Sequence, residues 1–131
     1  MSEAATSDEA DGPGVGAAGA ERALVRMREM SADLRGCAIL DSAGTVLAAT
    51  GDPERWGEAA SALLAAADAA RGEPVVRAHV ATDDGEAFAL REGPLAMVAA
   101  TDRFTLASLM LFDMRAVLRD LVDLPTTPRG K

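Results

Sequence analysis

The sequence predicts an α/β (α+β) domain: a five-stranded antiparallel sheet with helices on both faces. Three observations support this prediction. Short glycine-containing turns separate apolar runs, as they do in hairpins. Two of those runs, 37–40 and 95–100, are apolar at consecutive positions, which is typical of central strands covered on both faces. Between the two sets of strands, residues 58–71 read EAASALLAAADAAR, a helix that is apolar almost all round.

The first helix is expected over residues 20–34, and Gly36 ends it. A hairpin follows, in which 37–40 pairs with 46–49 and Gly44 takes the left-handed position of the loop. The helical stripe consists of Ala20, Ala23, Leu24, Met27, Met30 and Leu34, with charged residues mostly opposite.

The second helix has clear end signals. Asp52 is a suitable N-cap, Pro53 suits the first helical position, and Gly72 with Pro74 closes the helix. Three strands are then expected over 75–82, 86–91 and 95–100, joined by Asp-Asp-Gly and Gly-Pro turns. The run 75–82 alternates in polarity, which predicts an edge strand.

The last helix is expected to be capped by Thr101 or Asp102 and to run to about Leu124. Its predicted sheet-facing stripe consists of Leu106, Leu109, Met110, Met114, Val117, Leu118 and Leu121. Leu111, Phe112 and Val122 fall partly off that stripe, and they could form a partner groove with the first helix.

The element order is therefore α-β-β-α-β-β-β-α over residues 20–124, the length of one domain. Residues 1–19 read as an acidic Gly/Ala-rich tail without the apolar residues that would stabilise a fold. Residues 125–131 read as a second flexible tail after a proline.

Composition excludes several classes of function. A net charge of −8 and a pI near 4.5 argue against nucleic-acid binding. The apolar runs are too short to span a bilayer, so no membrane insertion is expected. There is no signal-peptide pattern, and the single Cys37 allows no intrachain disulfide, so a cytoplasmic protein is expected.

Residues that could carry chemistry are few. The G-x-G-x-x-G pattern over 14–19 is not preceded by a predicted strand, which favours a linker over a dinucleotide site. Cys37 lies in an apolar strand, where a free cysteine is commonly a small buried hydrophobe. A Cys37–His79 pair and a pH-sensing role for His79 remain minor alternatives. With one His and one Cys, no metal, cofactor or catalytic set is expected, and the chain is predicted not to be an enzyme.

The apolar helix over 58–71 predicts an associating protein. A surface helix of a small domain buries one stripe and solvates the other. Only Ser61 and Asp68 interrupt the run of Ala and Leu from Ala59 to Ala70. A helix of this kind requires cover on two sides, and the second cover is most simply another molecule.

The sequence resembles the roadblock/LC7 family. The resemblance rests on GCAILDSAGTVLAATG (36–51), the Ala-rich helix, AFALREGPLAMVAATD (87–102) and FTLASLMLFDMRAVLRDL (104–121). It implies a sheet of order 2-1-5-4-3, with one helix on one face and two on the other. It also implies a homodimer formed through the second helix and the edge strands, and a small Ras-like GTPase as partner. The family has no fixed catalytic residues to carry over.

The predicted homodimer interface lies on the second helix and the edge strand. It comprises Ala59, Leu63, Ala66, Ala67, Ala70, Val76 and Ala78. A possible face for the GTPase comprises Phe112, Arg115 and Arg119, where two arginines one helical turn apart could meet an acidic switch region; a solvated face, with Arg119 paired to Asp123, is the alternative. The favoured function is a non-enzymatic regulator or adaptor of the GTPase. The alternative is a small-molecule-binding sensor module of similar fold, and an enzyme that uses Cys37 or the carboxylates is a weaker third.

Overall fold

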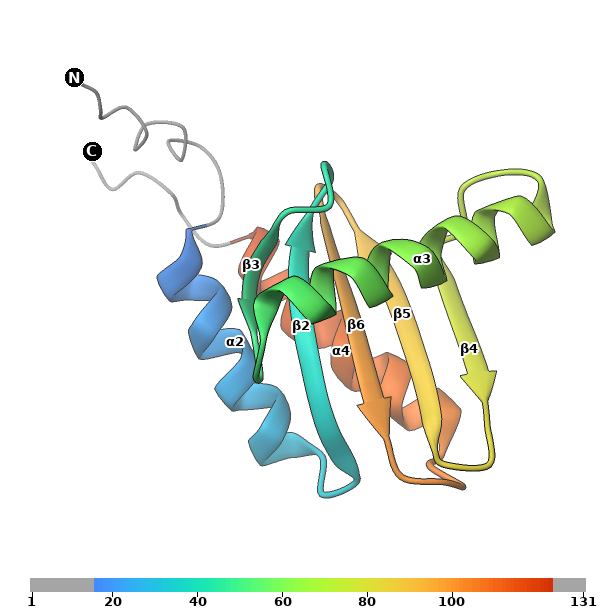
Figure 1. Ribbon diagram of the computed structural model, residues 1–131. Coiled ribbons are helices and arrows are strands. Elements are labelled where there is room, and N and C mark those ends of the chain that lie inside the picture. The colour runs from blue at the N-terminus through green and yellow to red at the C-terminus, as the bar shows by residue number, and fades with distance from the viewer. Residues whose placement is uncertain (1–15, 124–131) are drawn as a thin grey trace.

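A five-stranded antiparallel sheet separates the helices into two layers, as Figure 1 shows. The computed structural model describes residues 16–123. The strand order is β3-β2-β6-β5-β4, which is 2-1-5-4-3 when the strands are counted along the chain. The elements are α2 Ala17–Met30, β2 Leu34–Asp41, β3 Val46–Ala49, α3 Pro53–Arg71, β4 Arg77–Ala81, β5 Glu86–Glu92, β6 Leu95–Thr101 and α4 Ala107–Val122. The predicted fold class and element order are confirmed.

The two strands that are apolar at consecutive positions lie at the centre of the sheet, as predicted. β2 and β6 pair along their whole length, with Ile39 opposite Met97. β5 pairs with β6 on the other side, and β4 forms the edge next to β5. The alternating strand is therefore an edge strand.

The α2 and α4 layer covers the sheet face with the larger core. Its biggest buried side chains come from both helices and from three strands, so large residues interdigitate across the whole interface. They include Met27, Ile39, Phe88, Met97, Met114 and Leu118.

The α3 layer covers the opposite face with a smaller core. Only Ala60 and Leu64 of α3 are buried, and apart from Leu40 they pack on alanine and valine residues of the sheet. Those buried sheet residues are Ala38, Leu40, Ala89, Ala96 and Val98.

Both ends of α3 follow the sequence signals. The Asp52 carboxylate accepts a hydrogen bond from the Glu54 N–H at 3.0 Å, and Pro53 opens the helix. Gly72 closes it with φ +82°, and its N–H donates to the carbonyl of Asp68.

The prediction that the first helix runs from 20 to 34 was wrong at both ends. α2 begins at Ala17 and ends at Met30, and Leu34 opens β2 opposite Thr101 of β6. Leu34 fits the helical stripe by spacing, but pairing with β6 determines its conformation. Because β6 is distant in the sequence, the residues next to Leu34 do not indicate this pairing.

The predicted start of the last helix was also wrong. Thr101 ends β6, and α4 begins at Ala107 after a turn. Phe104 in that turn has φ +64°, a left-handed conformation that interrupts any helix starting at Asp102. The predicted stripe holds from Met110 onward, but Leu106 and Leu109 are exposed and do not face the sheet.

The predicted tails fall largely outside the part of the chain that the structure describes, since residues 1–15 and 124–131 are not described. The same applies to the first two residues of the G-x-G-x-x-G pattern. Among the described residues, no helix is long and apolar enough to cross a membrane.

Candidate protein-interaction surface

The outer side of α3 is an exposed ridge of alanine methyl groups. Ala60 is buried and Leu63 and Ala67 are half-buried, whereas the other alanines of the helix face outward. The exposed ridge comprises Ala59, Ala62, Ala65, Ala66, Ala69 and Ala70. Among the exposed residues from 59 to 70, Ser61 is the only polar one, so a second apolar surface could cover the ridge closely.

A groove of about 560 Å³ runs between the first turns of α3 and the sheet. Trp56 and Leu63 form its helical wall, and Val80, Ala87 and Val98 form its floor. The indole N–H of Trp56 donates to the Thr50 carbonyl at 2.8 Å, which fixes the ring as a wall. The space stays open because the side chains of the floor are short and those of α3 do not fill it.

The groove reaches the free edge of the sheet. Within residues 16–123, β4 pairs only with β5, so its other side presents unpaired backbone groups. Val76 and Val80 are 66% and 41% exposed. An unpaired edge with exposed valines is suited to pairing with another strand.

The predicted interface residues occupy two adjacent places. Ala59, Ala66 and Ala70 are exposed on the α3 ridge, with Leu63 and Ala67 half-buried beneath them. On the edge-strand side, Val76 is exposed just before β4, and Ala78 is half-buried on the α3 side of the sheet. The sequence did not predict the groove between these places, because its volume depends on where α3 crosses the sheet.

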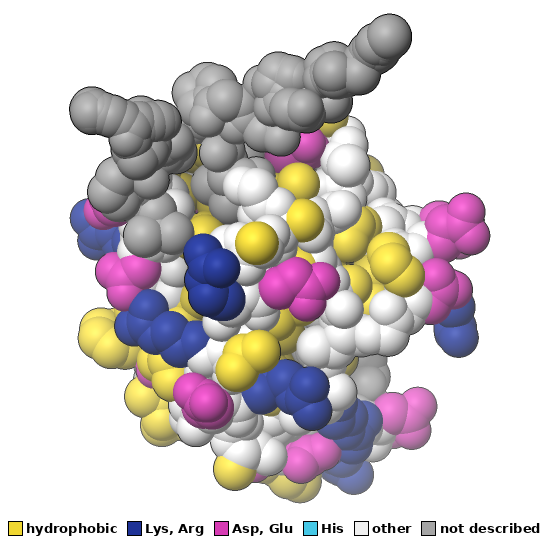
Figure 2. Space-filling model, turned by 90° about the vertical axis from the view of Figure 1, so that its left-hand side faces the viewer, with side chains coloured by type: hydrophobic (Ala, Val, Ile, Leu, Met, Phe, Trp, Pro, Cys, Tyr) yellow, Lys and Arg dark blue, Asp and Glu magenta, His cyan; other side chains and the backbone are white. Residues whose placement is uncertain are grey.

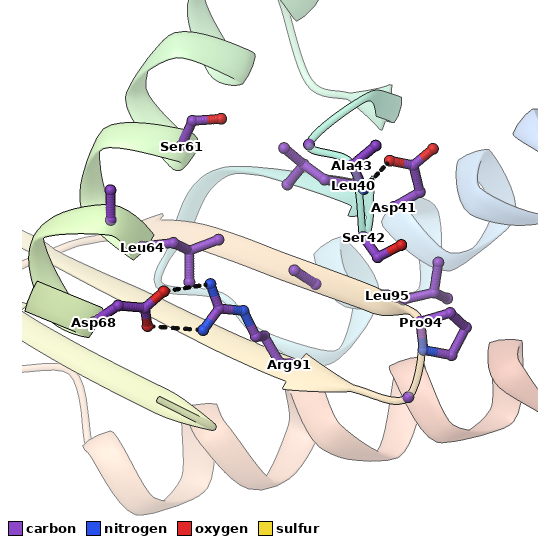
Figure 3. Close-up of a pocket in the computed structure, with 14 residues that line it drawn as sticks. Leu40, Asp41, Ser42, Ala43, Ser61, Leu64, Asp68, Arg91, Pro94 and Leu95 are labelled. Atoms are coloured by element: carbon purple, nitrogen blue, oxygen red, sulfur yellow. Dashed lines mark hydrogen bonds and ion pairs between the residues drawn. The ribbon is translucent and has the colours of Figure 1, made fainter. Parts of the chain in front are cut away.

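Asp68 serves the fold and does not belong to the exposed ridge. Figure 3 shows its carboxylate facing the Arg91 guanidinium, with oxygen–nitrogen distances of 2.9 and 3.0 Å. It also accepts the Val75 N–H at 2.8 Å. The Arg91 hydrogen bonds, followed by that backbone bond, hold the pKa of Asp68 below its ordinary value. Asp68 therefore ties the end of α3 to β5 and to the segment before β4.

The pocket in Figure 3, about 290 Å³, lies between α3 and the turns after β2 and β5. Its most polar groups are already paired. Arg91 binds Asp68, and Asp41 accepts the N–H groups of Ala43 and Thr45. A small molecule would find few free polar groups there apart from Ser42 and Ser61.

Cys37 has the surroundings of a structural cysteine. It is fully buried, and desolvation raises its pKa to about 11, which disfavours the reactive thiolate. His79 binds Glu86 instead, with Nε2 2.7 Å from Oε1, and its ring stacks on Phe88. That hydrogen bond from His79 is the main reason that the pKa of Glu86 lies below its ordinary value. Among residues 16–123 there is no group of three His, Cys, Asp or Glu placed to hold a metal.

The predicted partner face on α4 is exposed, but its arginines are not free charges. Phe112 is 69% exposed. Arg115 and Arg119 both lie near the Glu92 carboxylate of β5, at 3.6 and 3.4 Å, so Glu92 takes the place foreseen for Asp123. Figure 2 shows the side of the molecule that carries α2, where basic and acidic side chains are interleaved without a basic stripe.

Solved structures similar to this chain share its fold. The roadblock/LC7 domain of Streptomyces avermitilis matches with a TM-score of 0.66 at 16% identity, over 77% of this chain and 92% of that one. MglB of Myxococcus xanthus matches with 0.59 at 14% identity, over 80% and 89%. An MglB structure with a tetrameric arrangement matches with 0.64 at 16% identity, over 80% and 88%. No protein-family profile and no curated protein matches the sequence. The predicted roadblock/LC7 fold is confirmed.

Proposed function

We propose that this chain, which has the roadblock/LC7 fold, is a homodimeric regulator or adaptor for a small Ras-like GTPase and not an enzyme. The proposal rests on one observation: α3 covers its face of the sheet only in part. The alanine ridge, the groove beside it and the unpaired β4 edge lie next to one another. Together they form an apolar surface that a second copy of the same surface can cover.

A twofold arrangement supplies cover for all three features. Two α3 helices that meet through alanines can approach closely, because no long side chain holds them apart. Two β4 strands related by a twofold axis run antiparallel, so their free edges can exchange hydrogen bonds. The groove would then receive side chains of the partner copy.

The GTPase part of the proposal rests on the fold. Bacterial members of the resembled family often work beside small Ras-like GTPases and act by positioning the GTPase's own groups. This chain fits such a role, because its single thiol is buried and its His79 is engaged by Glu86. Phe112, Arg115 and Arg119 remain the proposed contact, now with Glu92 as part of the cluster.

The dimer is tested with Ala66→Asp, which places a carboxylate on the exposed ridge without disturbing the core of one copy. We expect a cost of several kcal/mol to association, because the charge would be desolvated at the interface. Ala18→Asp, on the exposed side of α2, is the matched control. Light scattering on both variants measures the result, and an unchanged mass for Ala66→Asp contradicts the proposed interface.

The GTPase is tested with the purified small Ras-like GTPases of the source organism. At least one is expected to bind the wild-type chain or to change its rate of GTP hydrolysis. Arg115→Glu together with Arg119→Glu should weaken that binding while the dimer persists. Absence of binding and of any rate change for every such GTPase contradicts this part of the proposal.

A small-molecule sensor is the second candidate, and one observation favours it. The groove lies within the volume range of about 300–1,000 Å³ that ligand sites occupy, and one wall is aromatic. Native mass spectrometry of the purified chain distinguishes the two functions. A bound small molecule supports the sensor, whereas a two-chain mass without added ligand mass supports the dimer.

A further inference from the structure

A second apolar surface lies on the opposite side of the sheet, at the start of α4. We define the α4 patch as Phe104, Leu106, Leu109 and Phe112. These side chains are 83%, 64%, 54% and 69% exposed. α3 does not reach this patch, because α3 covers the other face of the sheet. The α4 patch is therefore a surface separate from the proposed dimer interface.

The exposure of Phe104 is maintained by specific contacts. Its backbone has φ +64°, which is strained for a residue with a side chain. Its N–H donates to Oε2 of Glu86 at 2.6 Å, and the other oxygen of that carboxylate binds His79. The Arg103 guanidinium lies 4.7 Å from the centre of the Phe104 ring. These contacts hold a large apolar ring in solvent, at a cost that an interaction with another chain would offset.

The α4 patch has a basic neighbour beside one of its side chains and acidic neighbours beside two others. Arg103 lies beside Phe104, whereas Asp33 and Asp113 line a shallow groove next to Leu106 and Leu109. Neither aspartate forms an ion pair with another residue of the described range 16–123. In a twofold pair of such patches, the basic part of one copy can face the acidic part of the other.

The exposed area agrees with a contact between two copies. A phenylalanine side chain presents roughly 200 Å², so the two rings expose roughly 300 Å² and the four side chains on the order of 500 Å². Two copies would together bury about 1,000 Å², near the lower limit for a specific interface. Such a contact is expected to be weak and concentration-dependent.

We propose that the α4 patch binds the α4 patch of a second copy, through a twofold contact that is separate from the α3 surface. The proposal does not depend on the proposed function. Since Phe112 also belongs to the suggested GTPase face, self-association would compete with that contact.

The test is sedimentation velocity on the full chain from about 5 to 500 µM. The wild type should form larger species as its concentration rises. Phe104→Ser with Phe112→Ser should move the midpoint of that transition at least tenfold higher, and Glu86→Ala should move it less. Val25→Ser is the matched control, because Val25 is an exposed apolar residue of α2 outside the patch. Circular dichroism confirms that each variant is folded.

The Ala66→Asp background separates this proposal from the proposed dimer. With the α3 surface blocked, patch contacts should still produce a two-chain species at high concentration, and the double serine change should abolish it. A wild type of constant mass over the whole range overturns the proposal. A double variant that assembles like the wild type overturns it as well, and so does a patch that binds only a different protein.

Discussion

The two faces of the sheet differ in how completely this chain covers them. On the α2 and α4 face, Phe88, Met97, Met114 and their neighbours fill the space between sheet and helices. On the α3 face, Ala60, Leu64 and the half-buried Trp56 and Leu63 cover a floor made mostly of alanine and valine, and they leave a groove of about 560 Å³. The first face is completed by the chain alone, whereas the second has the volume and the exposed methyl groups that another chain would complete.

The difference follows from side-chain volume. A helix rich in alanine approaches the sheet closely but covers little of it, because short side chains do not reach beyond the line of contact. The same short side chains make its outer surface suitable for another helix. The composition of α3 therefore accounts for both the thin cover and the proposed association.

The largest predicted effect is on the completed face. Phe88→Ala should destabilise the protein by about 3–5 kcal/mol, because it leaves a cavity among residues that cannot collapse into it. Leu64→Ala on the α3 face should cost about 2 kcal/mol, near the lower end for leucine, since its surroundings are thinly packed. Urea unfolding at low protein concentration measures the free energy of unfolding of both variants. Equal losses of stability would contradict the proposed contrast between the two faces.

A smaller effect is predicted where Trp56 forms the wall of the groove. A Cβ placed on Gly36 would lie 2.7 Å from Oγ1 of Thr50 and 3.0 Å from Cζ2 of Trp56. Gly36→Ala should therefore cost about 1–3 kcal/mol and displace the indole. Trp56 is the only tryptophan, so its fluorescence reports the displacement directly. An unshifted emission spectrum would show that the wall does not depend on Gly36.

Acid should weaken the tie between α3 and β5. Because the pKa of Asp68 is lowered in the folded state, its contribution is fully present above the unfolded value of about 4 and is lost as pH falls through the folded value. Asp68→Asn should make the melting temperature less dependent on pH below about 4. Thermal melts from pH 2.5 to 6 on both proteins measure the slope, and identical slopes contradict the assigned role.

The smallest predicted effect concerns Cys37. Its pKa of about 11 and full burial mean that the native thiol should not react at pH 8. A disulfide reagent should label Cys37 only after denaturant is added. Rapid labelling of the native protein would indicate that the completed face opens.

The elements that could be predicted from the sequence are those determined by residues close together in the chain. Asp52, Pro53 and Gly72 define α3, and consecutive apolar residues identify β2 and β6 as central strands. The errors have distant causes. Leu34 belongs to β2 because β6 pairs with it. Phe104 ends any early helix through a hydrogen bond to Glu86, eighteen residues away, and no local pattern contains that bond.

The candidate surface was predictable in part for the same reason. The apolar α3 helix is visible in the sequence, and six of its eight alanines are exposed in the structure. The groove and the pairing of Arg119 with Glu92 depend on how the helices cross the sheet. Leu106 precedes α4, whose start the sequence did not locate, and Leu109 lies about 100° around the helix from the buried Met110, off the stripe that faces the sheet.

The proposed α3 homodimer is tested most directly by the mass of the wild-type chain in solution at low micromolar concentration, where the weak α4 contact contributes little. Sedimentation equilibrium should give twice the chain mass of 13.5 kDa, and Ala66→Asp should return it to a single chain. A wild type that sediments as one chain at every concentration would contradict the proposed dimer, because the α3 face would then be stable in water without a partner.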